Sequence, residues 1–119
     1  MGPARFPKLA RLHRAGEFQK LKREGASFHG NFIVLSFVHV PQSPMRFGLI
    51  TSRRVGPAVI RNRVRRRLRE IVRADRARIV AEGWCVLVAR ARAADASFHQ
   101  MREDWRALAR RARLLRASE

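Results

Sequence analysis

The chain has 119 residues, and 27 lysines and arginines against 9 aspartates and glutamates give it a formal net charge of +18. Hydrophobic residues make up 46% of the sequence, which excludes an intrinsically disordered chain and predicts one globular domain whose charge is most easily balanced by a polyanion such as nucleic acid. The single cysteine, Cys85, excludes an intrachain disulfide, a disulfide-rich secreted scaffold and a cysteine-rich zinc site.

The N-terminal region predicts an arm followed by a short helix. Residues 1–10 include Pro3 and Pro7 and predict an extended basic arm, with no apolar core of signal-peptide length behind it. A helix is expected over residues 17–23, with Gly25 as its stop. No run in the sequence approaches the roughly 18 apolar residues that a membrane span needs, so we expect a cytoplasmic protein.

The next segments predict β-structure. Residues 32–40 are rich in β-branched and aromatic side chains and predict a strand. Residues 41–44 contain two prolines and predict a turn. Residues 46–52 predict a second strand, which we expect to lie antiparallel to the first across that turn. The pattern also allows a short extra strand near residues 27–29.

An amphipathic helix is predicted from Pro57, as the first helical position after Gly56, to about Ile79. Its apolar residues recur at i, i+4, i+8, i+11 and i+12, and this stripe consists of Ile60, Val64, Leu68, Ile71 and Val72. Residues 84–89 form a nearly continuous apolar run, which is typical of a strand buried on both faces. Strand, helix and strand in this order predict a βαβ unit with parallel strands.

The last helix is expected to start at Ser97, because Gln100 three residues later completes a capping box. Its expected apolar face consists of Phe98, Met101, Trp105, Leu108, Ala112 and Leu115. The order α-β-β-α-β-α predicts an α+β fold. We expect a two-layer sandwich over residues 11–116, with a mixed sheet of about four strands and a βαβ crossover that carries the basic helix.

Arginine dominates residues 53–73, where nine arginines stand against one acid, Glu70. At about 100° per residue, one narrow outward stripe of the helix collects Asn62, Arg66, Arg69 and Arg73, with Arg63 and Arg65 on its flanks. Pairing within the helix cannot neutralise this face, whereas a bound polyanion can. Because the apolar stripe is committed to the core, these arginines favour a nucleic-acid surface over a membrane-surface or calmodulin-type helix and over a merely solvated face.

Catalytic patterns are not found in this sequence. The four histidines, at positions 13, 29, 39 and 99, show no helical pairing that would hold a metal ion. There is no glycine-rich phosphate loop or nucleophile elbow, and nine acids give little support to a self-contained two-metal nuclease. We therefore expect no catalytic residue and no metal site in the protein itself.

The run from Arg53 to Glu70, Arg-Arg-Val-Gly-Pro-Ala-Val-Ile-Arg-Asn-Arg-Val-Arg-Arg-Arg-Leu-Arg-Glu, closely resembles the bacterial ribonuclease P protein subunits. That family carries a basic pair, then Gly-x-Ala-Val, then Arg-Asn-Arg and a basic helix. Further matching pieces occur in the same order, namely Arg11-Leu12, residues 17–20, Gly25, Gly48-Leu49 and residues 84–89. The resemblance covers residues 11–113.

The resemblance implies a protein that joins a large catalytic RNA, the ribonuclease P RNA, and assists endonucleolytic removal of the 5′ leader from precursor tRNA. The RNA would supply the active site and bind most of the Mg²⁺, and no membrane contact or stable protein partner is implied. The residues assigned to the contact with the catalytic RNA are Arg53, Arg54, Arg61, Asn62, Arg63, Arg65, Arg66, Arg69 and Arg73.

The family's leader-binding cleft lies between the first helix, the sheet and the basic helix. The residues assigned to it are Phe18, Lys22, Val34 and Ser36. Many members of the family have aromatic residues at the positions of Lys22 and Ser36. Because base stacking on an aromatic ring contributes about 1–3 kcal/mol per base, we expect leader binding to depend more on charge in this chain.

Two other classes of nucleic-acid-binding protein compete with this interpretation. A ribosomal or other structural RNA-binding protein with no processing role shares the size and charge, but the Arg-Asn-Arg run between strand and helix argues against it. A DNA-binding regulator needs mixed polar residues to read base edges, whereas this helix is nearly all arginine. The sequence leaves open the architecture of the RNA subunit, the oligomeric state of the holoenzyme, other RNA substrates, and whether the arginine preference reflects a GC-rich genome or a warm habitat.

Overall fold

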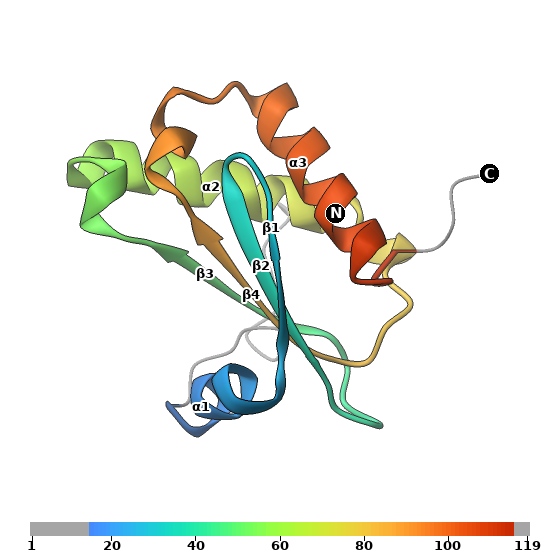
Figure 1. Ribbon diagram of the computed structural model, residues 1–119. Coiled ribbons are helices and arrows are strands. Elements are labelled where there is room, and N and C mark those ends of the chain that lie inside the picture. Colours follow the sequence, from blue (N-terminus) through green and yellow to red (C-terminus); the bar gives the residue numbers. More distant parts are fainter. Residues whose placement is uncertain (1–14, 116–119) are drawn as a thin grey trace, which may run out of the picture.

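A computed structural model describes residues 15–115, and the arm predicted over residues 1–10 lies outside them. A mixed four-stranded sheet forms the middle of the molecule, in the order β1-β2-β4-β3. The strands are β1 (Ala26–His29), β2 (Ile33–His39), β3 (Arg46–Thr51) and β4 (Gly83–Ala89). β4 runs antiparallel to β2 and parallel to β3, which confirms the predicted mixed sheet and βαβ unit (Figure 1).

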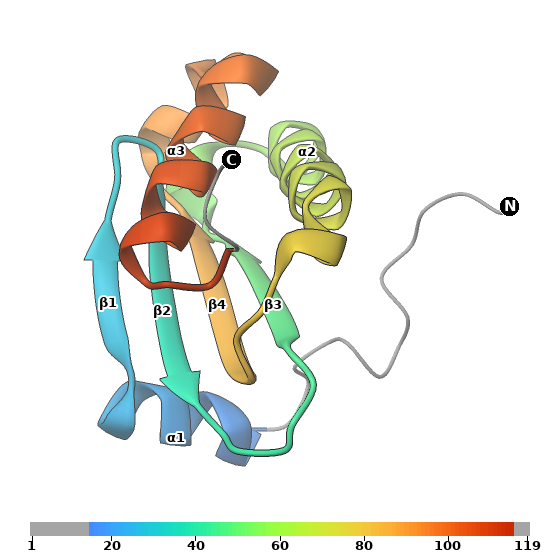
Figure 2. The same ribbon diagram turned by 90° about the vertical axis from the view of Figure 1, so that its right-hand side faces the viewer.

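In the described part of the chain, three α-helices and three short 3₁₀ segments accompany the sheet. The helices are α1 (Ala15–Glu24), α2 (Ala58–Ala74) and α3 (Phe98–Arg111), and the 3₁₀ segments are η2 (Arg53–Val55), η3 (Arg76–Arg78) and η4 (Ala91–Asp95). Figure 2 shows α2 and α3 side by side over the sheet, with α1 across the far end of the strands. This arrangement confirms the predicted two-layer α+β sandwich. No helix in the described part of the chain is long and apolar enough to cross a membrane.

The main core lies between the sheet and the two longer helices. From α2, the buried residues are Val64, Leu68, Ile71 and Val72, which confirms the predicted apolar stripe, and Ile60 packs against them half-buried. From α3, Trp105 is fully buried, and its ring meets that of Phe47 edge-on at 6.1 Å between centroids. Cys85 on the central strand is fully buried as well, and this burial raises the pKa of its thiol.

Local signals at the helix ends are only partly confirmed. The capping box of α3 is present: the Ser97 hydroxyl accepts from the Gln100 amide, and the Gln100 side chain accepts from the Ser97 amide. Pro57 lies one position before α2 instead of inside its first turn. Phe98 is 37% exposed, and Leu115 lies beyond the end of α3, where it forms a β-bridge with Ile79.

Two further predictions are wrong for reasons of long-range packing. β2 and β3 are antiparallel in direction but not neighbours, because β4 lies between them and pairs with both. The basic helix ends at Ala74, not near Ile79, because Asp75 turns its buried carboxylate toward α3 and the chain continues as η3.

Candidate nucleic-acid interface

The outward face of α2 is formed by the polar stripe opposite its buried residues. Asn62 and Arg66 are exposed, while Arg69 and Arg73 are half-buried. The first turn of the helix contains no acidic residue, and Glu70 is the one acid along its length. The structure therefore brings together the four residues predicted for this stripe, on a helix whose apolar side is already packed.

Arg65 is held in place at the edge of this face. Its Nη1 donates to Oδ1 of Asn62 at 3.0 Å, and its Nη2 donates to Oγ1 of Thr51, the last residue of β3, at 2.8 Å. The guanidinium thus joins the helix to the end of the strand. A fixed guanidinium loses less conformational entropy when it binds a phosphate than a freely rotating one does.

Two arginines on the other flank of α2 hold a neighbouring segment. Nη2 of Arg63 donates to the carbonyl oxygen of Ala94, and Nη1 of Arg67 donates to that of Ala96, each at 3.1 Å. Arg63 was predicted to contact RNA, but its side chain is half-buried and hydrogen-bonded within the fold. Sequence reasoning assigns no role to Arg67, because a helical projection does not reveal the carbonyl groups of Ala94 and Ala96.

More arginines gather where β4 ends. Arg53 and Arg54 on η2 are exposed, as expected of the basic pair, and Arg61 near the start of α2 is half-buried. Arg54, Arg90 and Arg92 border a depression of about 350 Å³ that reaches Val88 and Ala89. Arg90 donates from Nη1 to the carbonyl oxygen of Gly30 at 2.8 Å, and the Arg92 guanidinium lies 5.7 Å from the centre of the Phe32 ring. Of these three arginines, only Arg54 is predicted from the sequence, because Arg90 and Arg92 reach this depression only through the fold.

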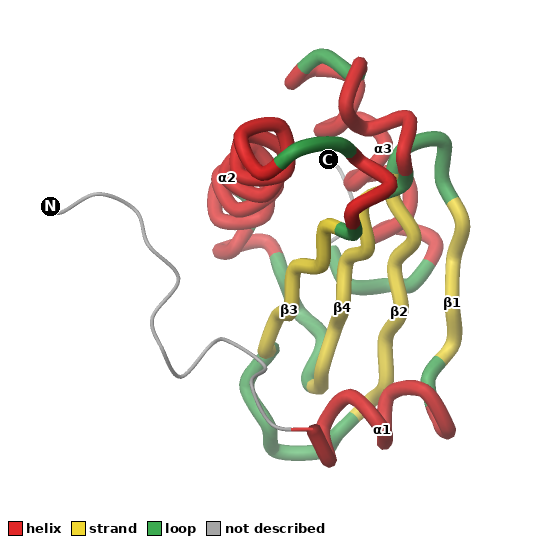
Figure 3. Tube along the Cα trace, turned by 90° about the vertical axis from the view of Figure 1, so that its left-hand side faces the viewer, coloured by secondary structure: helices red, strands yellow, loops and turns green. Residues whose placement is uncertain are grey.

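The second face of the sheet carries a groove beside α1. Figure 3 shows α1 at one end of the strands and α2 at the other. Leu21 of α1 packs on Val38 and Val86, and the partly buried Val40, Trp84 and Val88 pack against this small cluster. The resulting groove has a volume of about 330 Å³ and is lined by Leu21, Lys22, Gly25, Ser27, Ser36, Ile50, Val86 and Val88.

Three of the four residues predicted for a leader cleft lie at or beside this groove. Lys22 and Ser36 line it, and Ser36 shares a hydrogen bond of 2.8 Å with the hydroxyl of Ser27. Val34 lies opposite Val88 in the strand register, which places it on the same face next to the groove. Phe18 belongs to α1, but its side chain lies outside the described part of the structure.

The chemistry available at these surfaces is that of binding. Guanidinium groups suit phosphates, and a groove with apolar walls and a few hydroxyls suits unpaired bases. Within the described residues, no group of three or more histidine, cysteine, aspartate or glutamate side chains is placed to hold a metal ion.

Comparisons with known proteins agree with one another. A family model described as Ribonuclease P matches residues 6–113. The chain is 36% identical over 107 residues to the ribonuclease P protein component of Syntrophomonas wolfei, covering 90% of each chain. It is 40% identical over 108 residues to that of Chloroflexus aurantiacus, covering 90% of this chain and 80% of the relative.

Solved structures show the same fold. The ribonuclease P protein of Thermotoga maritima matches with a TM-score of 0.75 at 27% identity, over 84% of this chain and 96% of that one. The protein from Staphylococcus aureus matches with a TM-score of 0.82 at 22% identity, over 89% of this chain and 97% of that one.

Proposed function

The chain belongs to the family of bacterial ribonuclease P protein components, and we propose that its α2 face binds the ribonuclease P RNA while its α1 groove binds the 5′ leader of precursor tRNA. As a member of this family it is a subunit of the ribonucleoprotein that processes the 5′ end of tRNA, and the ribonuclease activity belongs to that assembly. The proposal assigns the two RNA contacts of this role to the α2 face and the α1 groove. It treats residues 11–116 as one RNA-binding domain that acts in the cytoplasm without a stable protein partner.

The observation that carries the proposal is the exposed charge of Arg66, for which no hydrogen bond or ion pair is found among the described residues. Its side chain is exposed on the outward stripe, between the exposed Asn62 and the half-buried Arg69. On the flanks of the same helix, Arg63, Arg65 and Arg67 donate hydrogen bonds inside the fold. The stripe therefore offers charge to a partner, while the flanks fix the helix that presents it. A run of phosphates along this face would relieve the repulsion between like charges.

Cleavage chemistry is assigned to the RNA in this proposal. The described protein residues do not fit a Mg²⁺ site, because no three candidate ligands come together among them. Mg²⁺ held by the RNA would activate water for hydrolysis. The protein contributes binding and orientation of the leader.

The groove beside α1 has the size and lining for a single strand. Lys22 at its border can contact a leader phosphate, and the Ser27–Ser36 hydroxyl pair can exchange its mutual hydrogen bond for bonds to a base edge or a ribose. Val86 and Val88 form an apolar floor for a base face. This lining supports a leader site that works by charge and hydrogen bonds, with Phe18 as the aromatic expected from the family.

Salt dependence of RNA binding tests the α2 surface. Arg66→Gln should weaken binding of the ribonuclease P RNA and lower the slope of log affinity against log salt by about 0.7 to 0.9, the value of one phosphate contact. The matched control is Arg110→Gln, which removes an exposed arginine from the outer side of α3. Equal slopes for Arg66→Gln and the wild type would refute the assignment of this face.

A cleavage assay tests the role in processing. The protein alone should leave precursor tRNA intact, and the protein with the ribonuclease P RNA should release the 5′ leader. RNA binding without any effect on cleavage would instead favour a purely structural RNA-binding protein.

A further inference from the structure

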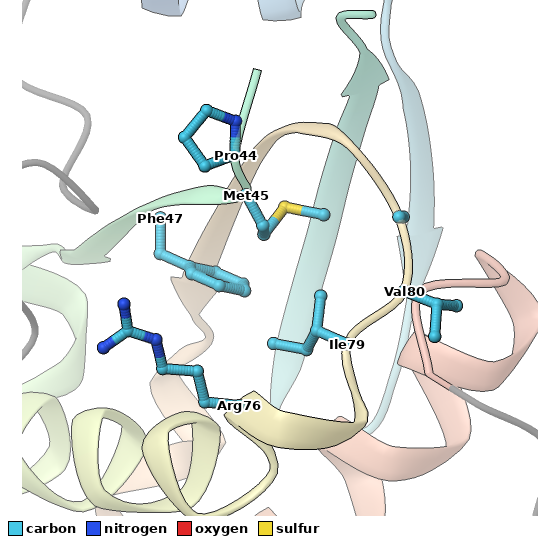
Figure 4. Close-up of a pocket in the computed structure, with 7 residues that line it drawn as sticks. Pro44, Met45, Phe47, Arg76, Ile79 and Val80 are labelled. Carbon is cyan, nitrogen blue, oxygen red and sulfur yellow. The ribbon is translucent and has the colours of Figure 1, made fainter. Parts of the chain in front are cut away.

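A hollow outside both proposed RNA surfaces opens where α2 ends. It has a volume of about 280 Å³ and is lined by Pro44, Met45, Phe47, Arg76, Ile79, Val80 and Ala81. Apart from Phe47 on β3, these residues come from two connections that are far apart in sequence, the loop between β2 and β3 and the segment between α2 and β4. Figure 4 shows the side chains of Met45, Phe47 and Ile79 around the opening, with the Arg76 guanidinium beside Phe47.

Both walls of this hollow are fixed by hydrogen bonds. On one side, the Val80 amide donates to the carbonyl oxygen of Leu114 at 2.9 Å, which ties this wall to the end of α3. On the other side, Nε1 of Trp84 donates to the hydroxyl of Ser43 at 3.2 Å, next to Pro44. A binding site that is formed in advance loses little entropy when a ligand enters. The hollow is therefore a candidate site and not a gap left by loose packing.

Its chemistry combines an apolar interior with one positive charge. Met45 presents a thioether, which makes favourable contacts with aromatic rings, and Phe47 and Ile79 supply hydrocarbon surface. At the rim, Val80 is 55% exposed and extends the apolar lining to the surface. A flat aromatic group with an attached anion matches this combination.

The charge of Arg76 is available at the rim. Asp75, its neighbour in sequence, is 2% exposed and accepts hydrogen bonds from Trp105 and Arg106 in the opposite direction. Among the described residues, no hydrogen bond or ion pair to Arg76 is found. Its guanidinium is thus free to bind an anion at the mouth of the hollow.

The hollow lies at the C-terminal end of α2, beyond the last arginine of the stripe. The stripe runs through Arg66 and Arg73 toward the C-terminal end of the helix, and Arg76 follows within one turn of its last residue. An RNA strand whose phosphates follow the stripe would therefore reach Arg76 and the opening beside it. RNA-binding proteins commonly accommodate unstacked bases in such apolar sites next to a phosphate contact.

We propose that this hollow takes one unstacked nucleobase of the ribonuclease P RNA, with an adjoining phosphate on Arg76. The inference rests on the proposed binding of that RNA by α2. The base would lie against Met45 and Phe47, out of contact with water, and Arg76 would hold its backbone. The site would fix the position of the RNA along the helix, which phosphate contacts alone do not do.

Two variants separate the apolar contact from the charge. Ala81→Leu fills the hollow without changing charge, and Arg76→Gln removes the charge without filling it. For Ala81→Leu we expect affinity for the ribonuclease P RNA to fall about 5- to 150-fold, the range for one lost base contact, with an unchanged salt slope. For Arg76→Gln we expect the salt slope to fall by about 0.7 to 0.9. Base-specific chemical probing should show one RNA base that the wild-type protein protects and the Ala81→Leu protein does not.

Controls keep the outcomes distinct. Thermal melting shows whether Ala81→Leu folds. If that variant does not fold, Met45→Ala takes its place in the experiment, because it removes the thioether without adding volume. If both hollow variants bind like the wild type while Arg66→Gln binds weakly, the inference is overturned and the proposed function stands. If Arg66→Gln also binds like the wild type, both fail. If only Arg76→Gln lowers the affinity for RNA, and the Ala81→Leu protein protects the same RNA bases as the wild type, the site is a phosphate contact only. The inference of a base pocket is then overturned.

Discussion

Nε1 of Trp105 donates a hydrogen bond of 2.9 Å to Oδ2 of Asp75, and this contact joins α3 to the end of α2 across 30 residues of sequence. Arg106 adds bonds of 3.2 Å from Nε and Nη2 to the same carboxylate, and Arg78 lies 3.9 Å away. One carboxylate therefore ends the basic helix, fixes it to its neighbour and neutralises arginines that do not face the RNA surface.

Replacing Asp75 should destabilise the fold. Asp75→Asn keeps the size of the side chain but removes the charge that Arg106 and Trp105 contact, so we expect the free energy of unfolding to fall by about 1.5–3 kcal/mol. Urea denaturation measures the change. Glu103→Gln, which removes an exposed carboxylate from the same helix as Trp105, is the matched control and should change stability by less than about 0.5 kcal/mol.

The same carboxylate predicts a pH dependence. Burial alone would raise the pKa of Asp75, but the hydrogen bonds from Arg106 and Trp105 and the nearby charges outweigh burial and hold it below its ordinary value of 3.8. A lowered pKa in the folded state means that the ionised group stabilises the fold above about pH 4 and that this contribution is lost as the pH falls through the folded-state pKa. The stability difference between wild type and Asp75→Asn should therefore shrink in acid. A difference that stays constant from neutral pH to about pH 2 would contradict this account.

Asp104 organises the turn between β1 and β2. Its carboxylate accepts hydrogen bonds from the amides of Asn31, Phe32 and Ile33 at 2.9 to 3.0 Å. A Cβ added at Gly30 would come within 2.5 Å of the same carboxylate oxygens. Asp104→Ala leaves buried donors unpaired and should cost at least about 1–3 kcal/mol.

The close approach of Gly30 to Asp104 allows a second test, with a substitution at Gly30 and a double variant. Gly30→Ala should also destabilise the protein, because the carboxylate must shift to make room. In the double variant the crowding is gone, so the combined cost should be smaller than the sum of the single costs. Additive costs in thermal or urea unfolding would show that the two residues act independently.

These contacts show where sequence reasoning succeeds and where it stops. The stripe from Val64 to Val72 and the capping box of Ser97 depend on residues within a few positions of one another, and both are confirmed. The neighbour of β2 depends on β4, which lies more than 40 residues later, and local turn chemistry at residues 41–44 wrongly favoured a hairpin. The end of α2 likewise depends on a distant residue, because Trp105 holds the Asp75 carboxylate from 30 residues later in the chain.

The candidate site residues also divide into those that local sequence places and those that only the folded chain places. Helical spacing is enough to place Asn62, Arg66, Arg69 and Arg73 on one face. It does not reveal that Arg63 and Arg67 meet the carbonyl groups of Ala94 and Ala96, since η4 approaches them only in the folded chain. The groove lining beyond Lys22 and Ser36, and the hollow at Arg76, likewise require the three-dimensional arrangement.

Neighbouring arginines on α2 should therefore respond differently to the same substitution. Arg67→Gln removes the bond to the Ala96 carbonyl and should lower the free energy of unfolding by about 1 kcal/mol, with little change in the salt slope of RNA binding. Arg66→Gln should instead lower the salt slope of RNA binding and leave the free energy of unfolding nearly unchanged. Thermal melting and RNA titration of both variants provide the comparison. A salt slope reduced equally by the two changes would mean that Arg67 also faces RNA.

The leader groove permits a gain-of-function test at Ser36. Its side chain is half-buried in a groove of about 330 Å³, beside Lys22 and opposite Val86 in the strand register. Ser36→Tyr loses the exposed hydrogen bond to Ser27 and the Ser36 hydroxyl proposed to contact the leader, but it adds an aromatic ring to the same face. Because stacking contributes about 1–3 kcal/mol per base, the holoenzyme should bind precursor tRNA about 5- to 150-fold more tightly. Mature tRNA has no leader, so its affinity should not change.

Glu103→Tyr places the same ring on the outer side of α3 and should affect neither RNA. An equal gain for precursor and mature tRNA would move the new contact from the leader to the tRNA body, and no gain for either would remove Ser36 from the leader path.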